Sequence, residues 1–155
     1  RRVDRAGWGF RAIQLGGALA FCWTLWTLID TPSVDVIAGE AGFALYAASL
    51  ALFWWAIASH DKAPPTHAFS GDAPLRLVSR GPYRLVRHPF YTSYLLAWFA
   101  GPVATQRLSL CVPAVLMTVI YVLAARQEEA KFLRSTLADS YRQYQAETGQ
   151  FLPRW

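Results

Sequence analysis

The chain has 155 residues, of which 54% are hydrophobic and 16% charged, and its formal net charge is +5. The length fits one domain, while the charged share lies well below the ~25% that is usual for soluble domains. A basic balance would suit a nucleic-acid binder, but the basic residues gather at the ends of apolar runs rather than along one soluble face. The composition therefore argues against a nucleic-acid partner and indicates an integral membrane protein.

Four apolar segments predict an all-α, polytopic membrane fold in a single domain that covers residues 1–155. Segments without Asp, Glu, Lys or Arg are 12–29, 41–59, 90–106 and 108–125. A span needs ~20 mostly apolar residues, so we expect each segment to cross the membrane. Gly101 and Pro102 interrupt the third segment and Pro113 lies in the fourth, which predicts a tight hairpin with irregular helix ends. The alternative is a buried soluble bundle, whose helices would show polar faces at 3.6-residue spacing.

The distribution of basic residues predicts the direction of insertion. Four Lys or Arg precede the first segment, five lie in the loop 60–89 and five in the tail 126–155, whereas the third connection has only Arg107. Basic loops stay on the cytoplasmic side. We therefore expect both termini, the loop and the tail to be cytoplasmic, in the inner membrane of a prokaryote.

Polar residues in 79–91 form the first stretch that could carry chemistry. Pro89 suits the first position of a helix, where its missing N–H costs nothing. His88 would then sit at the positive end of the third span, which suits an anionic group, and Tyr91 would lie about one turn further on the same face. A plainer interpretation is a positive-inside anchor with a helix cap, its arginines contacting lipid phosphate.

An acidic pair, Glu128 and Glu129, begins the second stretch directly after the fourth apolar segment. Acidic residues at a helix exit oppose the helix dipole unless a positive group meets them. That group could be a sulfonium or an amine of a ligand, and a pair of ribose hydroxyls could also bind the glutamates. Alternatively, Arg80, Arg84 or Arg87 could form a salt bridge with them. The residues alone leave these alternatives open.

The tail beyond the acidic pair is expected to form one amphipathic helix. Its apolar and aromatic residues recur at three- and four-residue spacings. They are Phe132, Leu133, Leu137, Tyr141 and Tyr144. Such a stripe packs against the rest of the protein or against the lipid surface.

Both stretches together resemble a known family. Residues 81–91, GPYRLVRHPFY, are similar to the GPYRxVRHPxY signature of the isoprenylcysteine carboxyl methyltransferase family, parts of which related phospholipid methyltransferases share. Glu128-Glu129, Leu133, the pair Tyr141 and Tyr144, and residues 151–153 (FLP) resemble the EE, L, YxxY and FxP pattern of the family's tail. The resemblance covers roughly residues 40 to 153.

This resemblance implies a helical membrane protein that binds S-adenosylmethionine without a Rossmann domain, and the chain has no GxGxxG motif after a strand. The implied cofactor-binding residues are Tyr83, Arg87, His88, Pro89, Tyr91, Glu128, Glu129, Tyr141 and Tyr144. The last two would close the pocket as part of a cytoplasmic C-terminal helix. Arg126 would bind or orient the acceptor, and the implied catalytic residues are Arg126 and Glu129, although either glutamate could carry the principal role.

The resulting hypothesis is methyl transfer from S-adenosylmethionine, with S-adenosylhomocysteine as product, to a lipophilic or small acceptor at the cytoplasmic membrane face. The acceptor could be a carboxylate, a thiol or an amine, and membrane lipid surrounds the protein. Alignment of nucleophile and methyl carbon supplies most of the rate. A neutral acceptor needs a base as well, for which His88 and the acidic pair are candidates. No metal is expected, because the histidines lack metal-ligand spacing.

Two other functions remain open. One is an NADPH-dependent membrane reductase of the sterol or steroid type, whose C-terminal pattern is related but whose chains are usually much longer. The other is a non-catalytic membrane scaffold that keeps the fold. Binding of the two cofactors distinguishes the three functions.

Overall fold

Within residues 6–30, 34–60 and 77–154, the parts of the chain that the computed structural model describes, the fold is helical. Its long helices are α1 (Ala6–Ile29), α2 (Val36–Ala58), α3 (Pro89–Thr105) and α4 (Cys111–Phe132). A shorter helix, α5 (Ala138–Glu147), follows, and 3-10 turns η1 (Gly81–Arg84) and η2 (Leu108–Leu110) precede α3 and α4. The all-α prediction is confirmed for the described residues.

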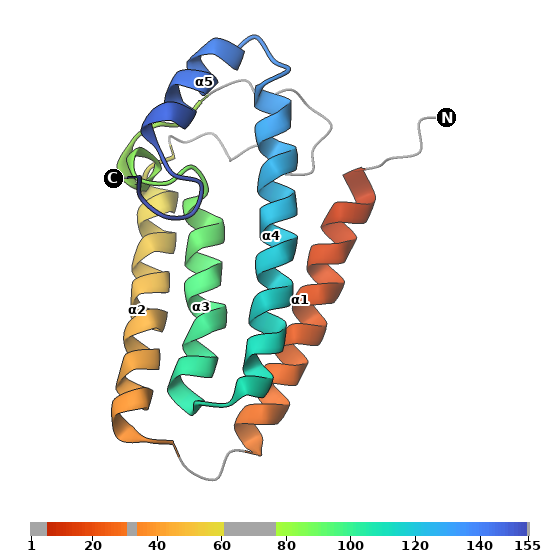
Figure 1. Ribbon diagram of the computed structural model, residues 1–155, viewed down its shortest axis with the longest axis vertical. Coiled ribbons are helices and arrows are strands. Elements are labelled where there is room, and N and C mark those ends of the chain that lie inside the picture. Colours follow the sequence, from red (N-terminus) through yellow and green to blue (C-terminus); the bar gives the residue numbers. More distant parts are fainter. Residues whose placement is uncertain (1–5, 31–33, 61–76, 155) are drawn as a thin grey trace.

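The long helices form a bundle in which α2 packs on α3, α3 on α4 and α4 on α1. The connection from α3 to α4 is short and turns on Gln106, whose backbone is left-handed with a φ of 53°. The two helices are therefore antiparallel, so that the start of α3 lies beside the C-terminal part of α4, which extends beyond it (Figure 1). Helix α5 lies across this end of the bundle (Figure 1).

Small residues bring α2 and α3 together. A Cβ on Gly42 would lie 2.4 Å from the Cβ of Ala104 and 2.8 Å from the carbonyl oxygen of Ala100. Two helical turns further along α2, the Ser49 hydroxyl donates a hydrogen bond of 2.7 Å to the carbonyl of Ser93. Small side chains let helix backbones approach closely where no hydrophobic effect drives association. This contact fixes the start of α3, on which the site is built.

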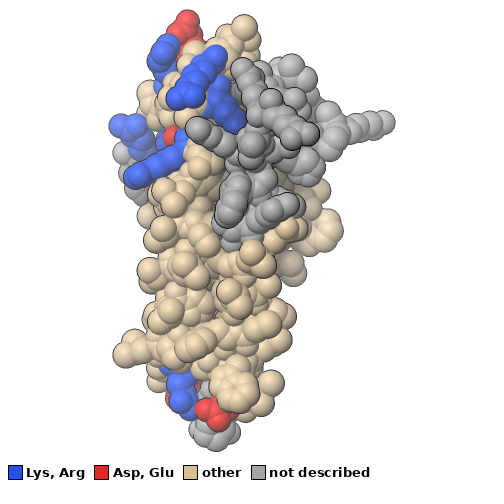
Figure 2. Space-filling model, turned by 90° about the vertical axis from the view of Figure 1, so that its right-hand side faces the viewer, with Lys and Arg blue, Asp and Glu red and all other residues tan. Residues whose placement is uncertain are grey.

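The exterior of the bundle is apolar between its two ends. Figure 2 shows charged side chains at the ends and none on the described middle of this face. Trp26 and Phe43 are each 75% exposed, and contiguous apolar surface of this kind marks a membrane or a partner. Helix α2 and the segment Leu108–Phe132 are long and apolar enough to cross a membrane, while Gln14–Ile29 is apolar but shorter.

Several predicted boundaries differ from the observed ones. Helix α1 begins at Ala6 and α2 at Val36, earlier than the apolar segments suggested. The expected interruption at Gly101-Pro102 is wrong, because α3 continues to Thr105. Pro102 lies in the last turn, where few backbone bonds depend on it. The irregular connection between α3 and α4 is confirmed by Gln106 and η2.

The prediction of one helix through the tail is also wrong. Helix α4 continues to Phe132 and then breaks before α5 begins at Ala138. Ser135 explains the break, since its hydroxyl donates to the carbonyl of Phe132 at 2.8 Å and accepts from the N–H of Leu137 at 3.1 Å. Serine that satisfies nearby backbone groups in this way competes with helix formation. Helix α5 consequently folds back, and Tyr141 stacks on Phe132 with ring centroids 4.6 Å apart.

Candidate active site

The loop before α3 is held in place at its start by η1. Gly81 has a left-handed backbone with a φ of 59°, and a Cβ there would lie 1.9 Å from the Ser59 hydroxyl oxygen. Only glycine fits such a position without strain. The side chain of Arg80 donates to the carbonyl of Ser59 at 2.8 Å. These contacts fasten the loop to the end of α2.

The loop then pairs with the chain after α5. Val86 and Gly149 form an isolated parallel β-bridge. The N–H of Arg87 donates to the carbonyl of Gly149 at 2.8 Å, and the N–H of His88 donates to that of Gln150 at 3.2 Å. Pro89 then begins α3 with His88 at the N-cap, as the sequence predicted. Main-chain bonds thus direct the side chains of Arg87 and His88 toward the end of α4.

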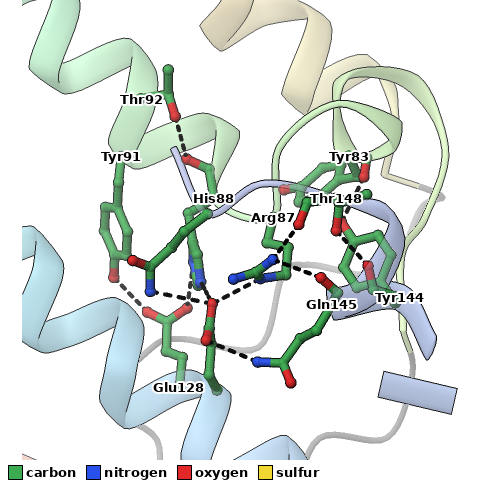
Figure 3. Close-up of polar contacts among 11 residues, drawn as sticks. Tyr83, Arg87, His88, Tyr91, Thr92, Glu128, Tyr144, Gln145 and Thr148 are labelled. Carbon is green, nitrogen blue, oxygen red and sulfur yellow. Dashed lines mark hydrogen bonds and ion pairs between the residues drawn. The ribbon is translucent and has the colours of Figure 1, made fainter. Parts of the chain in front are cut away.

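Four ionisable side chains meet there, and we call them the charged cluster: Arg87, His88, Glu128 and Glu129 (Figure 3). Oε1 of Glu129 lies 2.9 Å from Nε of Arg87 and 3.1 Å from Nε2 of His88. The other ring nitrogen of His88 lies 3.5 Å from Oε2 of Glu128. The hydroxyl of Tyr91 donates to Oε1 of Glu128 at 2.5 Å. The salt-bridge alternative for the acidic pair is therefore realised, with Arg87 as the cation.

The cluster balances two positive against two negative charges. Burial lowers the pKa of His88, but hydrogen bonds to Glu128 and Glu129 outweigh it, so that the pKa is raised. Burial alone would raise the pKa of Glu129, whereas His88 and Arg87 lower it to about 2. Both nitrogens of His88 face carboxylates, an arrangement that favours the doubly protonated ring. These contacts weaken both His88 and Glu129 as general bases, and the expectation that either serves as one stays a prediction.

Two glutamines complete the contacts of Glu129. The side-chain amide of Gln145, on α5, donates to Oε2 at 3.0 Å, and that of Gln150 donates to Oε1 at 3.3 Å. The guanidinium of Arg87 also donates to the carbonyls of Thr148 and Gln145. The sequence-based search missed both glutamines. The available signal was that Gln145 follows Tyr141 by one helical turn and so shares its face.

The two glutamates differ in how many hydrogen bonds their carboxylates accept. Glu129 accepts from Arg87, His88, Gln145 and Gln150. Glu128 accepts from Tyr91, has His88 at a longer distance and is 22% exposed, compared with 12% for Glu129. Of the pair, Glu128 has more capacity for a further donor such as an ammonium or hydroxyl group.

Of the predicted tyrosines, Tyr91 contacts the cluster directly, whereas Tyr83, Tyr141 and Tyr144 lie around it. Tyr144 is buried, and its hydroxyl donates to the carbonyl of Tyr83 at 2.6 Å. The hydroxyl of Tyr83 lies 2.8 Å from Nε2 of His60. Burial is the largest cause that raises the pKa of Tyr144 to about 12 and raises the pKa values of Tyr83 and Tyr141 as well, so these phenols stay neutral. They fix α5 over the loop that carries Arg87.

Arg126 lies one turn before Glu129 and is exposed. It makes no hydrogen bond to the charged cluster among the described residues. Its predicted contact with an acceptor stays a prediction. The part of the chain that the structure describes contains no group of three His, Cys, Asp or Glu residues placed to hold a metal ion.

The fold and the site define an all-helical protein with membrane-compatible helices and a buried charged cluster at one end of its bundle. A sequence model of the phospholipid methyltransferase family matches residues 37–140. The chain belongs to this family, which confirms the resemblance predicted from the two motifs. The match covers the loop motif and both glutamates of the charged cluster.

Similar proteins include three methanethiol S-methyltransferases. That of Pseudomonas sp. (strain GM41(2012)) is 30% identical over 151 residues, which cover 88% of this chain and 55% of the relative. That of Pseudomonas deceptionensis is 39% identical over 71 residues, which cover 46% of this chain and 26% of the relative. That of Bradyrhizobium diazoefficiens is 35% identical over 71 residues, which cover 46% of this chain and 24% of the relative. The chain thus spans about half the length, or less, of the curated relatives it matches. No solved structure matches it.

Proposed function

We propose that the chain is an S-adenosylmethionine-dependent methyltransferase whose site is the charged cluster. The observation that carries this proposal is the convergence of the family's two motifs. Arg87 and His88 come from the loop motif, Glu128 and Glu129 come from the acidic pair more than 40 residues later, and the two pairs are in direct contact. A largely buried group of charges, in which Glu128 has capacity for a further donor, lies next to an apolar bundle and suits a polar cofactor that must meet an apolar or small acceptor.

Membrane placement is part of the proposal. All four long helices would cross the inner membrane, with the charged cluster and α5 on the cytoplasmic side. The apolar exterior of the bundle supports this placement, as do Arg84, Arg134, Arg142 and Arg154, which are exposed near the α5 end. The remaining basic residues that led to the predicted orientation include Arg1, Lys62 and others outside the described residues.

The cofactor would bind beside Glu128. Its ammonium or ribose hydroxyls would donate to this carboxylate, which accepts one strong hydrogen bond, from Tyr91. When bound, the cofactor supplies an electrophilic methyl group. Glu129 would organise the site rather than touch the methyl group, because its oxygens already accept four hydrogen bonds. This division supports Glu128, rather than Glu129, as the ligand-binding residue in this proposal.

An acceptor that arrives as an anion fits this site best. His88 is held in its protonated form and Glu129 in its ionised form, so both are poor bases at neutral pH. A thiolate or a carboxylate needs alignment but no base. The named activity of the relatives makes a small thiol the first acceptor to test, and Arg126 could pair with an anionic acceptor as it approaches.

Calorimetric titration of the detergent-purified protein with S-adenosylhomocysteine tests the cofactor. We expect micromolar binding, weakened about tenfold or more by Glu128→Gln, because a charge-assisted hydrogen bond is lost. Glu147→Gln is the matched control on the exposed side of α5 and should bind like the wild type. NADPH should not bind.

The outcomes separate the candidate functions. Folded wild-type protein that binds no S-adenosylhomocysteine would refute the proposal, and binding of NADPH instead would favour the reductase. Transfer of a labelled methyl group to methanethiol, but not to the same thiol with Glu128→Gln, would identify the acceptor class. Binding without transfer to a thiol, a carboxylate or an amine would favour the scaffold.

A further inference from the structure

Gln145 stands apart from the residues that the motifs predict. Among the described residues, it alone hydrogen-bonds Oε2 of Glu129, at 3.0 Å, whereas Oε1 accepts from Arg87, His88 and Gln150. The two oxygens are thus held by different parts of the chain: Oε1 largely by the loop before α3, and Oε2 by α5. Figure 3 shows the Gln145 side chain reaching toward this carboxylate from α5.

We infer that Gln145 is a positioning residue for the methyl-transfer site and acts through Glu129. This inference rests on the proposed function, since it takes Glu128 as the group that binds the cofactor. The bond to Oε2 fixes the plane of the Glu129 carboxylate. That plane sets the direction of the His88 ring, whose far nitrogen faces Glu128. Gln145 therefore controls how Glu128 is presented to a ligand without touching the ligand.

The geometry shows why one bond matters. The terminal torsion of a glutamate side chain is broad and roughly two-fold. A carboxylate held only through Oε1 can pivot about that oxygen, and three donors on Oε1 do not prevent the rotation of Oε2. A donor on Oε2 removes this freedom, which is how supporting residues keep a site within the small tolerance that binding and catalysis need.

The side chain of Gln145 can be changed without removing its main-chain role. Its carbonyl accepts from Arg87 at 3.4 Å, and this contact belongs to the backbone. Gln145 is also only half-buried, so substitutions of similar length need not disturb packing. A loss of function in such variants would therefore report on the bond to Glu129.

Two substitutions separate positioning from packing. Gln145→Met keeps the length and removes the donor. Gln145→Glu places a second carboxyl beside Glu129, where the titratable neighbours are Arg87, His88, Glu128 and Tyr141. When protonated, the new carboxyl can donate as the amide does, and when ionised it repels Glu129.

The experiment is calorimetric titration with S-adenosylhomocysteine at pH 8 and pH 5, in parallel with the wild type. For Gln145→Glu we expect affinity about tenfold or more below the wild type at pH 8, and within about threefold of it at pH 5, because like-charged carboxylates do not both ionise readily. Gln145→Met should be weaker than the wild type by a similar factor at both pH values. Gln143→Glu, on the exposed side of the same helix, should match the wild type throughout.

Thermal unfolding of each variant in detergent should stay close to that of the wild type, which shows that folding is preserved. Wild-type affinity in both Gln145 variants would overturn the inference and leave the proposed function intact. Equal losses in both variants at both pH values would also overturn it, because the effect would then come from packing. Failure of the wild type itself to bind would overturn the proposed function and this inference together.

Discussion

Removing the guanidinium of Arg87 should release the C-terminal segment, residues 145–151, from the bundle. Arg87 and Glu129 form a salt bridge of 2.9 Å, and each side chain is 12% exposed. The same guanidinium donates to the carbonyls of Thr148 and Gln145. We choose Arg87→Met, because methionine retains an unbranched apolar stem while it removes the charge and every donor.

The size of the effect follows from this environment. Removing one partner of a buried ion pair lowers stability by about 3–5 kcal/mol, since the other charge is left uncompensated. Main-chain bonds from Arg87 and His88 to the C-terminal segment remain, so we expect local opening rather than loss of the fold. At about 1.4 kcal/mol per decade, the opening equilibrium of the segment should rise by about two to four orders of magnitude.

Hydrogen exchange followed by mass spectrometry measures this opening directly. Peptides that cover residues 145–151 should lose protection in Arg87→Met, while peptides from the middle of α2 and α3 should not. Arg142→Met is the matched control, because Arg142 and Asp139 form an exposed pair on α5 and exposed pairs contribute little. Unchanged protection of residues 145–151 in Arg87→Met would refute the view that the charged cluster holds this segment.

Three further outcomes are expected. Tyr144→Phe removes a buried hydrogen bond of 2.6 Å to the loop and should lower the free energy of unfolding by about 1 kcal/mol, measured by denaturant titration in detergent. Gly149→Ala would place a Cβ 1.7 Å from the carbonyl oxygen of Leu152, so binding of S-adenosylhomocysteine should be lost while the helix content seen by circular dichroism is kept. The pKa of Glu129 is depressed from 4.5 to about 2, so its contribution is complete above about pH 4.5 and is lost as the pH falls toward 2. Hydrogen exchange at residues 145–151 should accordingly accelerate, relative to the intrinsic rate, between pH 4.5 and 2 but not between pH 7 and 5.

Hydrophobic segments and helix-cap chemistry carried the fold prediction. Apolar runs located the four long helices, and Pro89 marked the start of α3 to within one residue. The break after Phe132 could not be seen in the same way, because Ser135 tolerates a helix interior as well as a turn. Its hydroxyl here bonds to the nearby main chain, to the carbonyl of Phe132 and the N–H of Leu137, and the residue type alone does not show that this local pattern prevails over a continuous helix.

Motifs also located most of the charged cluster, since Arg87, His88 and both glutamates stand in segments with a recognisable pattern. What the sequence did not contain is the pairing between them. The contact of His88 with both carboxylates depends on the antiparallel turn at Gln106, and this contact raises the pKa of His88. Gln145 was missed because its position one turn after Tyr141 shows which face it shares, but not that Glu129 lies opposite it.

The parallel bridge between Val86 and Gly149 joins positions that are far apart in the chain. During biosynthesis the helices α2, α3 and α4 are complete before Gly149 is made, so the bundle can form first and the site only afterwards. Closing a longer loop adds little entropic cost, about 0.6 kcal/mol for each doubling of its length. The separation in sequence therefore affects when the bridge can form much more than it affects the stability of the bridge. The main-chain bonds that Gly149 and Gln150 accept from Arg87 and His88 therefore join the tail to helices that are already complete.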